Sequence, residues 1–280
     1  MAARFSAFSF VDRIADVEPG VRARGGFTIP AALAEFSPGL VAEAVGQLAA
    51  WLGMAHTDFQ RRPVAALAGE TRIVRPALPG QYLDLGVEVE SIDADAIAYR
   101  GWARVRDAAI IELERCVGPM LPMEDFDAPE LVRRQFALLT GAGAQSGRFI
   151  GVAPLPVVAI DSEPGKRTRA ALHVPTAAPF FADHFPRRAV FPATLLLDTQ
   201  IRLATELAEE ILCPTGGAEC QPSRVIDVKL RSFILPGAAV EVEAEVQSHT
   251  SAAITVALVG KLNSKRVSTA RVEVVRWVAS

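Results

Sequence analysis

Two parts of this sequence carry residues of the types and in the surroundings that proton transfer needs. His184, one of only four histidines, lies in the apolar, proline-containing stretch FFADHFPRRAVFPATLLLDTQ (residues 180–200), where Asp198 follows it by fourteen positions. Another carboxylate, Glu43, lies in the apolar stretch SPGLVAEAVGQLAAWLGMA (residues 37–55), with Gln47 four positions later. An imidazole titrates near neutral pH and suits a general base, and a carboxyl in apolar surroundings suits a general acid. The open question is which acid is the partner of His184.

Both carboxylates fall in stretches whose apolar residues recur every three and four positions, which predicts amphipathic helices over residues 37–55 and 192–212. Glu43 and Gln47, at i and i+4, therefore share one helical face. Asp198 has Arg202 at i+4, and this cation is expected to hold Asp198 ionised and make it a poor proton donor.

The two helices belong to two copies of one larger unit. EPGVRARGGFTIP (18–30) aligns with EPGKRTRAALHVP (163–175) without a gap, and each Pro-Gly predicts a hairpin that leads into a strand. After each helix, alternating apolar residues predict antiparallel strands, at 78–92, 96–105 and 108–117 in the first copy and at 235–249, 252–262 and 266–278 in the second. The sequence therefore predicts an α+β fold in which each sheet can wrap a long helix.

We place the first unit at residues 1–125, a connecting helix and linker at 126–150, and the second unit at 151–280. In the connecting segment Asp127 is the expected N-cap, Pro129 falls in the first turn, Gly141 ends the helix, and GAGAQSG is the linker. The copies differ at one place that matters for function. The first lacks the loop FFADHFPRRA (180–189), so it has no counterpart of His184.

Composition narrows the class of protein. The net charge of −3 implies no general affinity for nucleic acid or an anionic membrane. The longest apolar stretch is interrupted by Glu43 and Gln47, the first residues lack signal-peptide character, and the three cysteines lack metal-ligand spacing, so we expect a cytoplasmic protein with reduced thiols. No phosphate loop or dinucleotide fingerprint is present, and no cofactor or metal is expected.

The stretch FFADHFPRRAVFPATLLLD resembles the signature of bacterial β-hydroxyacyl-ACP dehydratases of the hot-dog fold. In that family a histidine precedes Phe-Pro, a second proline comes eight positions after the histidine, and an Asp or Glu comes fourteen after it. The residues that match in place are His184, Pro186, Val190, Pro192 and Asp198. DRIADVEPG and SPGLVAEAVGQLA resemble the opening strand and helix of the same family. The resemblance implies a double hot-dog, two antiparallel sheets that each wrap a long central helix.

In this family the histidine comes from one unit and the acid from the other. The resemblance therefore implies a site that combines His184 with Glu43, since the first copy offers no histidine to Asp198. Asp198 is kept as the weaker alternative acid.

The supporting residues implied are Gln47, Gly39, Phe185, Pro192 and Ala193. The two helix starts, Pro38-Gly39 and Pro192-Ala193, are alternative places where backbone N–H groups can stabilise a thioester oxyanion. The sequence also departs from the family pattern, with Asp183 and Ala193 where glycines are usual and Arg202 where Gln is usual.

Other residues of chemically active types are expected to have structural or solvent-exposed roles. His56, His173 and His249 are expected to be structural, and Trp51, Met54 and Phe59 to be core residues or the wall of an acyl tunnel. Arg187 and Arg188 are either solvated or face an acidic carrier protein or the phosphate of phosphopantetheine.

The predicted function is dehydration of β-hydroxyacyl thioesters, held on acyl carrier protein or CoA, in fatty-acid or polyketide-type biosynthesis. A hot-dog thioesterase and a non-catalytic acyl-binding subunit are the alternatives. Acyl carrier protein is the expected partner, and the chain is compatible with a homodimer or a partner subunit.

Overall fold

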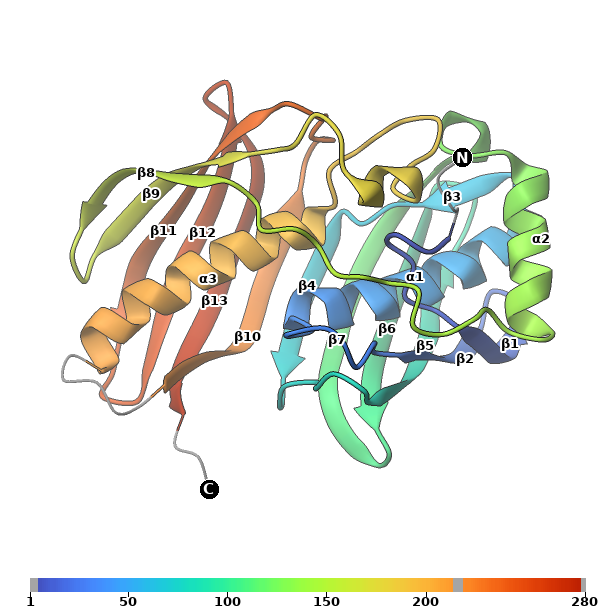
Figure 1. The fold of residues 1–280 in the computed structure, drawn as a ribbon, viewed down its shortest axis with the longest axis horizontal. Helices are drawn as coiled ribbons and strands as arrows, with labels where there is room; N and C mark the ends of the chain where they lie inside the picture. The colour runs from blue at the N-terminus through green and yellow to red at the C-terminus, as the bar shows by residue number, and fades with distance from the viewer. Residues whose placement is uncertain (1–4, 214–218, 278–280) are drawn as a thin grey trace.

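One antiparallel sheet forms the body of the protein, with thirteen strands in the part of the chain that the structure describes (Figure 1). The computed structural model describes residues 5–213 and 219–277. In the first half the elements are β1 (Arg13–Glu18), β2 (Arg22–Thr28), α1 (Pro38–His56), β3 (Arg61–Pro63), β4 (Leu67–Ile73), β5 (Tyr82–Ile92), β6 (Ala96–Val105), β7 (Ala108–Pro122) and α2 (Pro129–Thr140). In the second half they are β8 (Val157–Glu163), β9 (Arg167–His173), α3 (Ala193–Leu212), β10 (Glu219–Leu230), β11 (Ala239–His249), β12 (Ala253–Leu262) and β13 (Lys265–Trp277).

The order of strands across the sheet shows the internal repeat. It runs β1-β2-β5-β6-β7-β4 and then β10-β13-β12-β11-β9-β8, while the thirteenth strand, β3, pairs with β7 off this path. The second half therefore repeats the first in reverse about the β4–β10 pair. Thr71 and Val225 are partners at this seam, and the guanidinium of Arg224 forms a 3.0 Å ion pair with Glu70 across it. The expected two sheets are therefore joined into one continuous sheet, because β4 and β10 pair edge to edge and leave no free edge there.

The hairpins predicted from the Pro-Gly pairs are present as β1–β2 and β8–β9. Gly20 and Gly165 take positive φ angles of 78° and 67° in their turns, a conformation that favours glycine. The long helices also form as predicted. α1 packs on β2, β5, β6 and β7 and α3 on β9 to β13, and the two helices contact each other near the seam. One core of apolar side chains runs through both halves.

The connecting helix α2 begins one residue later than predicted. Its N-cap is Ala128 rather than Asp127, and no side chain caps it. Asp127 is buried and accepts a hydrogen bond from the Ala128 N–H, one residue ahead, rather than from the first turn of α2 as an N-cap would. Pro129 and Gly141 occupy the predicted start and end.

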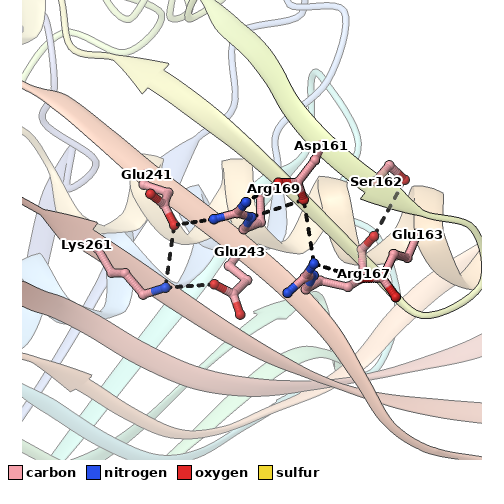
Figure 2. A network of polar contacts seen from close by, with 8 residues as sticks. All are labelled: Asp161, Ser162, Glu163, Arg167, Arg169, Glu241, Glu243 and Lys261. Carbon is pink, nitrogen blue, oxygen red and sulfur yellow. Dashed lines mark hydrogen bonds and ion pairs between the residues drawn. The ribbon is translucent and has the colours of Figure 1, made fainter. Parts of the chain in front are cut away.

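The solvent face of the second half carries a network of charged side chains on β8, β9, β11 and β12 (Figure 2). Arg169 bonds Asp161 and lies 3.5 Å from Glu241, and Lys261 reaches Glu241 at 3.4 Å and Glu243 at 2.8 Å. Exposed ion pairs of this kind each contribute about 0–1 kcal/mol to stability. The network therefore adds little stability and mainly marks the face of these strands that points to solvent. No α-helix among residues 5–213 and 219–277 has the length and hydropathy needed to cross a bilayer.

Candidate active site

His184 and Glu43 line the same cavity, although they are far apart in the sequence and come from opposite halves of the chain. The cavity has a volume of about 470 Å³ and extends from the loop of residues 180–192 along α1 to the seam strands β4 and β10. Its lining is mostly apolar and includes Ile97, Leu113 and Val225. Trp51 and Met54 also line it, whereas Phe59 packs on Phe136 of α2, 5.3 Å between ring centroids.

The loop around His184 fixes the imidazole in one tautomer. Nδ1 lies 2.8 Å from the backbone oxygen of Val190. A carbonyl oxygen can only accept, so Nδ1 carries the hydrogen and Nε2 keeps a free lone pair in the neutral ring. The ring stacks on Phe185, with centroids 4.0 Å apart. Removal of the ring from bulk water lowers the pKa of His184 below its ordinary 6.5, and the nearby Glu43 carboxylate opposes this shift. His184 is therefore neutral at pH 7 and able to accept a proton.

Both carboxylate oxygens of Glu43 are hydrogen bonded. Gln47 Nε2 donates to Oε1 at 2.9 Å, and the hydroxyl of Thr194, at the start of α3, lies 3.0 Å from Oε2. The Gln47 amide is held in this orientation because the Phe10 N–H donates to its Oε1 at 2.8 Å. An amide NH₂ group cannot accept, whereas a hydroxyl can. A proton carried by Glu43 therefore belongs on Oε2, beside Thr194.

The starts of α1 and α3 both border the cavity, but they differ in how their N–H groups are satisfied. At α1, Ser37 is the N-cap and accepts from the Leu40 N–H, and the Gly39 N–H donates to Asp198 at 3.1 Å. At α3 the N-cap is Pro192, which has no side-chain acceptor. Of these two helix starts, the first turn of α3 is thus the one without a side-chain cap, and Ala193 and Thr194 line the cavity there.

Asp198 lies at the start of α1, hydrogen bonded to the Ser37 hydroxyl and to the Gly39 N–H. Our expectation that Arg202 holds Asp198 ionised is wrong. The Arg202 guanidinium lies 3.9 Å from the Glu206 carboxylate, and both side chains are exposed. Burial instead raises the pKa of Asp198 to about 7, against the weaker opposing effects of Ser37, Gly39 and Arg202.

The two arginines of the His184 loop make local contacts. Arg187 donates from its guanidinium to the backbone oxygen of Glu124 at 3.0 Å. The Arg188 guanidinium lies over the ring of Phe233, 4.7 Å from its centroid. Both arginines are nevertheless exposed to solvent.

Sequence reasoning missed three residues of this site: Thr194, Arg62 and Asp183. Arg62 lines the cavity and lies over the Phe185 ring at 4.3 Å, and burial lowers the pKa of its guanidinium to about 10. Nothing in the RRP tripeptide indicates this position. Asp183 accepts hydrogen bonds from the N-terminal segment. Its departure from the glycine of the family pattern was the one feature of the sequence that could have pointed to this role.

The remaining histidines lie elsewhere. His56 ends α1, beside Gly20 of the first hairpin, and His173 and His249 are exposed on β9 and β11. Among the described residues no group of three or more His, Cys, Asp or Glu side chains is arranged to hold a metal ion. The chemistry that the site offers is proton transfer between a neutral imidazole and a carboxyl across an apolar cavity.

Comparison with known proteins bears on the fold and on the family of the second half of the chain. Residues 161–269 match the ApeI-like family, described as ApeI dehydratase. Solved structures of the same fold include a protein described provisionally as an oleoyl thioesterase from Lactobacillus plantarum, with 11% identity, coverage of 93% of this chain and 98% of that chain, and a TM-score of 0.61. The tesB protein of Mycobacterium avium subs paratuberculosis has 14% identity, coverage of 95% and 96%, and a TM-score of 0.58.

A conserved protein of unknown function with a hot-dog fold, from Alicyclobacillus acidocaldarius, has 10% identity, coverage of 98% of both chains and a TM-score of 0.53. At these identities the structural matches establish the fold. Residues 161–269, which include His184, match the ApeI-like family, and the chain has the hot-dog fold.

Proposed function

We propose that this protein dehydrates β-hydroxyacyl thioesters to enoyl thioesters, with His184 as the base and Glu43 as the acid. The observation that carries the proposal is the meeting of these two residues in one apolar cavity, from opposite halves of the chain. The dehydratase match over residues 161–269 supports it.

In this reaction Nε2 of His184 removes the proton from the α-carbon. The electron pair of that C–H bond forms the new double bond, and the bond between the β-carbon and its hydroxyl breaks. Glu43 gives the proton from Oε2 to the hydroxyl, which leaves as water. His184 ends the step protonated and Glu43 ionised, so one proton must return from the imidazole to the carboxylate before the next turnover.

The thioester oxygen gains negative charge as the α-proton leaves, and donors fixed in advance stabilise that charge best. The start of α3 suits this role better than the start of α1. Asp198 already accepts from the Gly39 N–H at α1, whereas no side chain caps α3, and Ala193 and Thr194 line the cavity. We therefore assign the oxyanion to the first turn of α3.

The mostly apolar lining of the cavity fits an acyl chain, and no cofactor is needed for this chemistry. We propose that the substrate is carried on the phosphopantetheine of acyl carrier protein or on CoA. The exposed Arg187 and Arg188, on the loop that bears His184, are suited to meet the acidic carrier or its phosphate.

Thioester hydrolysis is the second candidate, favoured by the thioesterases among the structures of the same fold. A glutamate and an uncapped helix start are also the groups that such a reaction needs to activate water and stabilise an oxyanion.

The test uses two pantetheine thioesters of equal chain length, one β-hydroxyacyl and one saturated, with product mass and free thiol measured in the same samples. A dehydratase converts only the first, to the enoyl thioester, and releases no thiol. Thiol release from both substrates would replace our proposal with hydrolysis. Binding of both without turnover would make the protein a non-catalytic acyl binder. His184→Ala serves as the inactive control.

A further inference from the structure

Residues 5–10 cross between the His184 loop of the second unit and helix α1 of the first. On one side, the carboxylate of Asp183 accepts hydrogen bonds from this segment. The donors are the N–H groups of Phe5 at 2.5 Å, Ala7 at 2.8 Å and Phe8 at 2.8 Å, and the Ser9 hydroxyl at 3.1 Å. Three backbone donors on one carboxylate fix the course of the segment beside His184.

On the other side, the same segment holds the amide of Gln47. The Phe8 carbonyl accepts from Gln47 Nε2 at 3.0 Å, and the Phe10 N–H donates to Gln47 Oε1 at 2.8 Å. Gln47 Nε2 also donates to Glu43. Asp183, next to the base, is thus linked to the acid Glu43 by hydrogen bonds to the backbone of residues 7–10 and, from that backbone, through Gln47.

Side-chain packing follows the same path. The Phe8 ring meets the His184 ring edge-on at 5.9 Å and the Phe10 ring at 4.9 Å between centroids. Phe8 and Phe10 are both buried, and Phe5, Phe8 and Ser9 form part of the cavity wall. The segment is therefore in contact with the base, with the residue that orients the acid, and with the space for substrate.

We infer that residues 5–10 form an active-site strap that sets the acid against the base, and that Asp183 is a positioning residue acting through this strap on Gln47 and Glu43. The inference rests on the proposed function for its catalytic meaning. A glycine, the residue that the resemblance leads one to expect at this position, would offer no side-chain acceptor for the three N–H groups of the strap.

The coupling between Asp183 and Gln47 through the strap can be measured without substrate, by amide hydrogen exchange. Asp183→Asn keeps the shape of the side chain but replaces one acceptor oxygen with an NH₂ group. Faster exchange is expected at Ala7 and Phe8, whose acceptor is altered, and also at Phe10, whose acceptor Gln47 is untouched. An unchanged Phe10 amide would show that the strap does not move as a unit and would overturn the inference.

The reciprocal variant covers the case in which Asp183→Asn fails to fold. Gln47→Ala removes the acceptor of Phe10, and exchange should then rise at Ala7 and Phe8 as well. The matched control is Asp12→Asn, a partly buried aspartate in the same N-terminal region that accepts from the Thr28 N–H and does not contact the strap. It should leave turnover and the strap amides as in the wild type.

In the dehydration assay, Asp183→Asn should lower kcat by about 10-fold or more and change KM less, because it acts on the acid rather than on binding. In a Gln47→Ala background the same substitution should cost little more, since both residues act through Glu43. Independent, multiplicative losses would assign Asp183 a purely structural role. Absence of dehydration in the wild type would count against the proposed function and leave the exchange test of the strap intact.

Discussion

Thr194 at the start of α3 lies 3.0 Å from the carboxylate of Glu43 in α1, and the reverse contact links the Gly39 N–H at the start of α1 to Asp198 in α3. The two contacts are related by the internal repeat, since Gly39 precedes Glu43 by four residues as Thr194 precedes Asp198. Only one of them has a histidine beside it. The repeat has thus kept two carboxylates at equivalent places. Glu43 lines the cavity, whereas Asp198 is bonded to the N-cap and first turn of α1.

Thr194→Val tests the first contact. The substitution keeps the shape of the side chain and removes the hydroxyl that neighbours Oε2 of Glu43. A hydrogen bond between uncharged groups contributes about 0.5–1.5 kcal/mol, so loss of the bond to the protonated Glu43 should lower kcat/KM by about 2- to 10-fold. Thr205→Val is the matched control, because the Thr205 hydroxyl bonds only the carbonyl of Ile201 within α3. Equal losses in both variants would point to helix damage instead.

Glu43→Gln and Asp198→Asn together test which acid serves His184. A positioned general acid typically supplies about 10²- to 10⁴-fold, so Glu43→Gln should lower kcat by that factor in a folded protein. Asp198→Asn should do much less, since its side chain is bonded to Ser37 and Gly39. Circular dichroism and melting temperature report the fold of each variant. A larger loss in Asp198→Asn would mean that the acid has been assigned to the wrong helix.

Much of this arrangement could be predicted, because the repeat supplies two copies of the same evidence. The Pro-Gly turns, the alternating strands and the two helices appear where their patterns place them. The seam strands β4 and β10 were not predicted. They contain Gly69 and Pro222, which interrupt the strand signal, and they pair with each other only because the two halves meet.

Side-chain partners were harder to predict than elements. Arg202 has acids at both i−4 and i+4, and helical spacing cannot choose between Asp198 and Glu206. The choice is made by Ser37 and Gly39, which come from the other half of the chain. Asp183 looked like a departure from the family pattern for the same reason, since its partners lie about 175 residues earlier.

The pH dependence of turnover tests His184 as the base. Its pKa is lowered below 6.5 by removal from bulk water, so the base is neutral down to a pH below that of a free imidazole. The acidic limb of kcat/KM should therefore have an apparent pKa under 6.5, below that of a free imidazole. His184→Ala should also abolish exchange of the substrate α-proton with solvent. Exchange that persists in this variant would remove His184 from the role.

The final prediction concerns Asp198 and stability. Its pKa is about 7 in the folded protein against an ordinary value of 3.8, so the folded state holds this proton more tightly than the unfolded state. Its contribution to stability is fully present below pH 3.8 and is lost as the pH rises through about 7, by an amount on the order of 4 kcal/mol. Asp198→Asn cannot ionise and can still bond Ser37 and Gly39, so it should be more stable than the wild type at pH 8 and similar near pH 4.

Melting temperatures of the two proteins across this range give the measurement, and their difference removes the titration of all other groups. Asp93→Asn is the contrasting control. Hydrogen bonds from the N–H groups of Asp95 and Ala96 lower the pKa of Asp93, so its carboxylate contributes stability above pH 3.8, and this variant should lose stability at pH 8. A constant difference between wild type and Asp198→Asn from pH 4 to 8 would mean that Asp198 is ionised in the folded protein throughout. Its bond to Ser37 would then be that of a carboxylate cap on α1, with no proton held between the two helices.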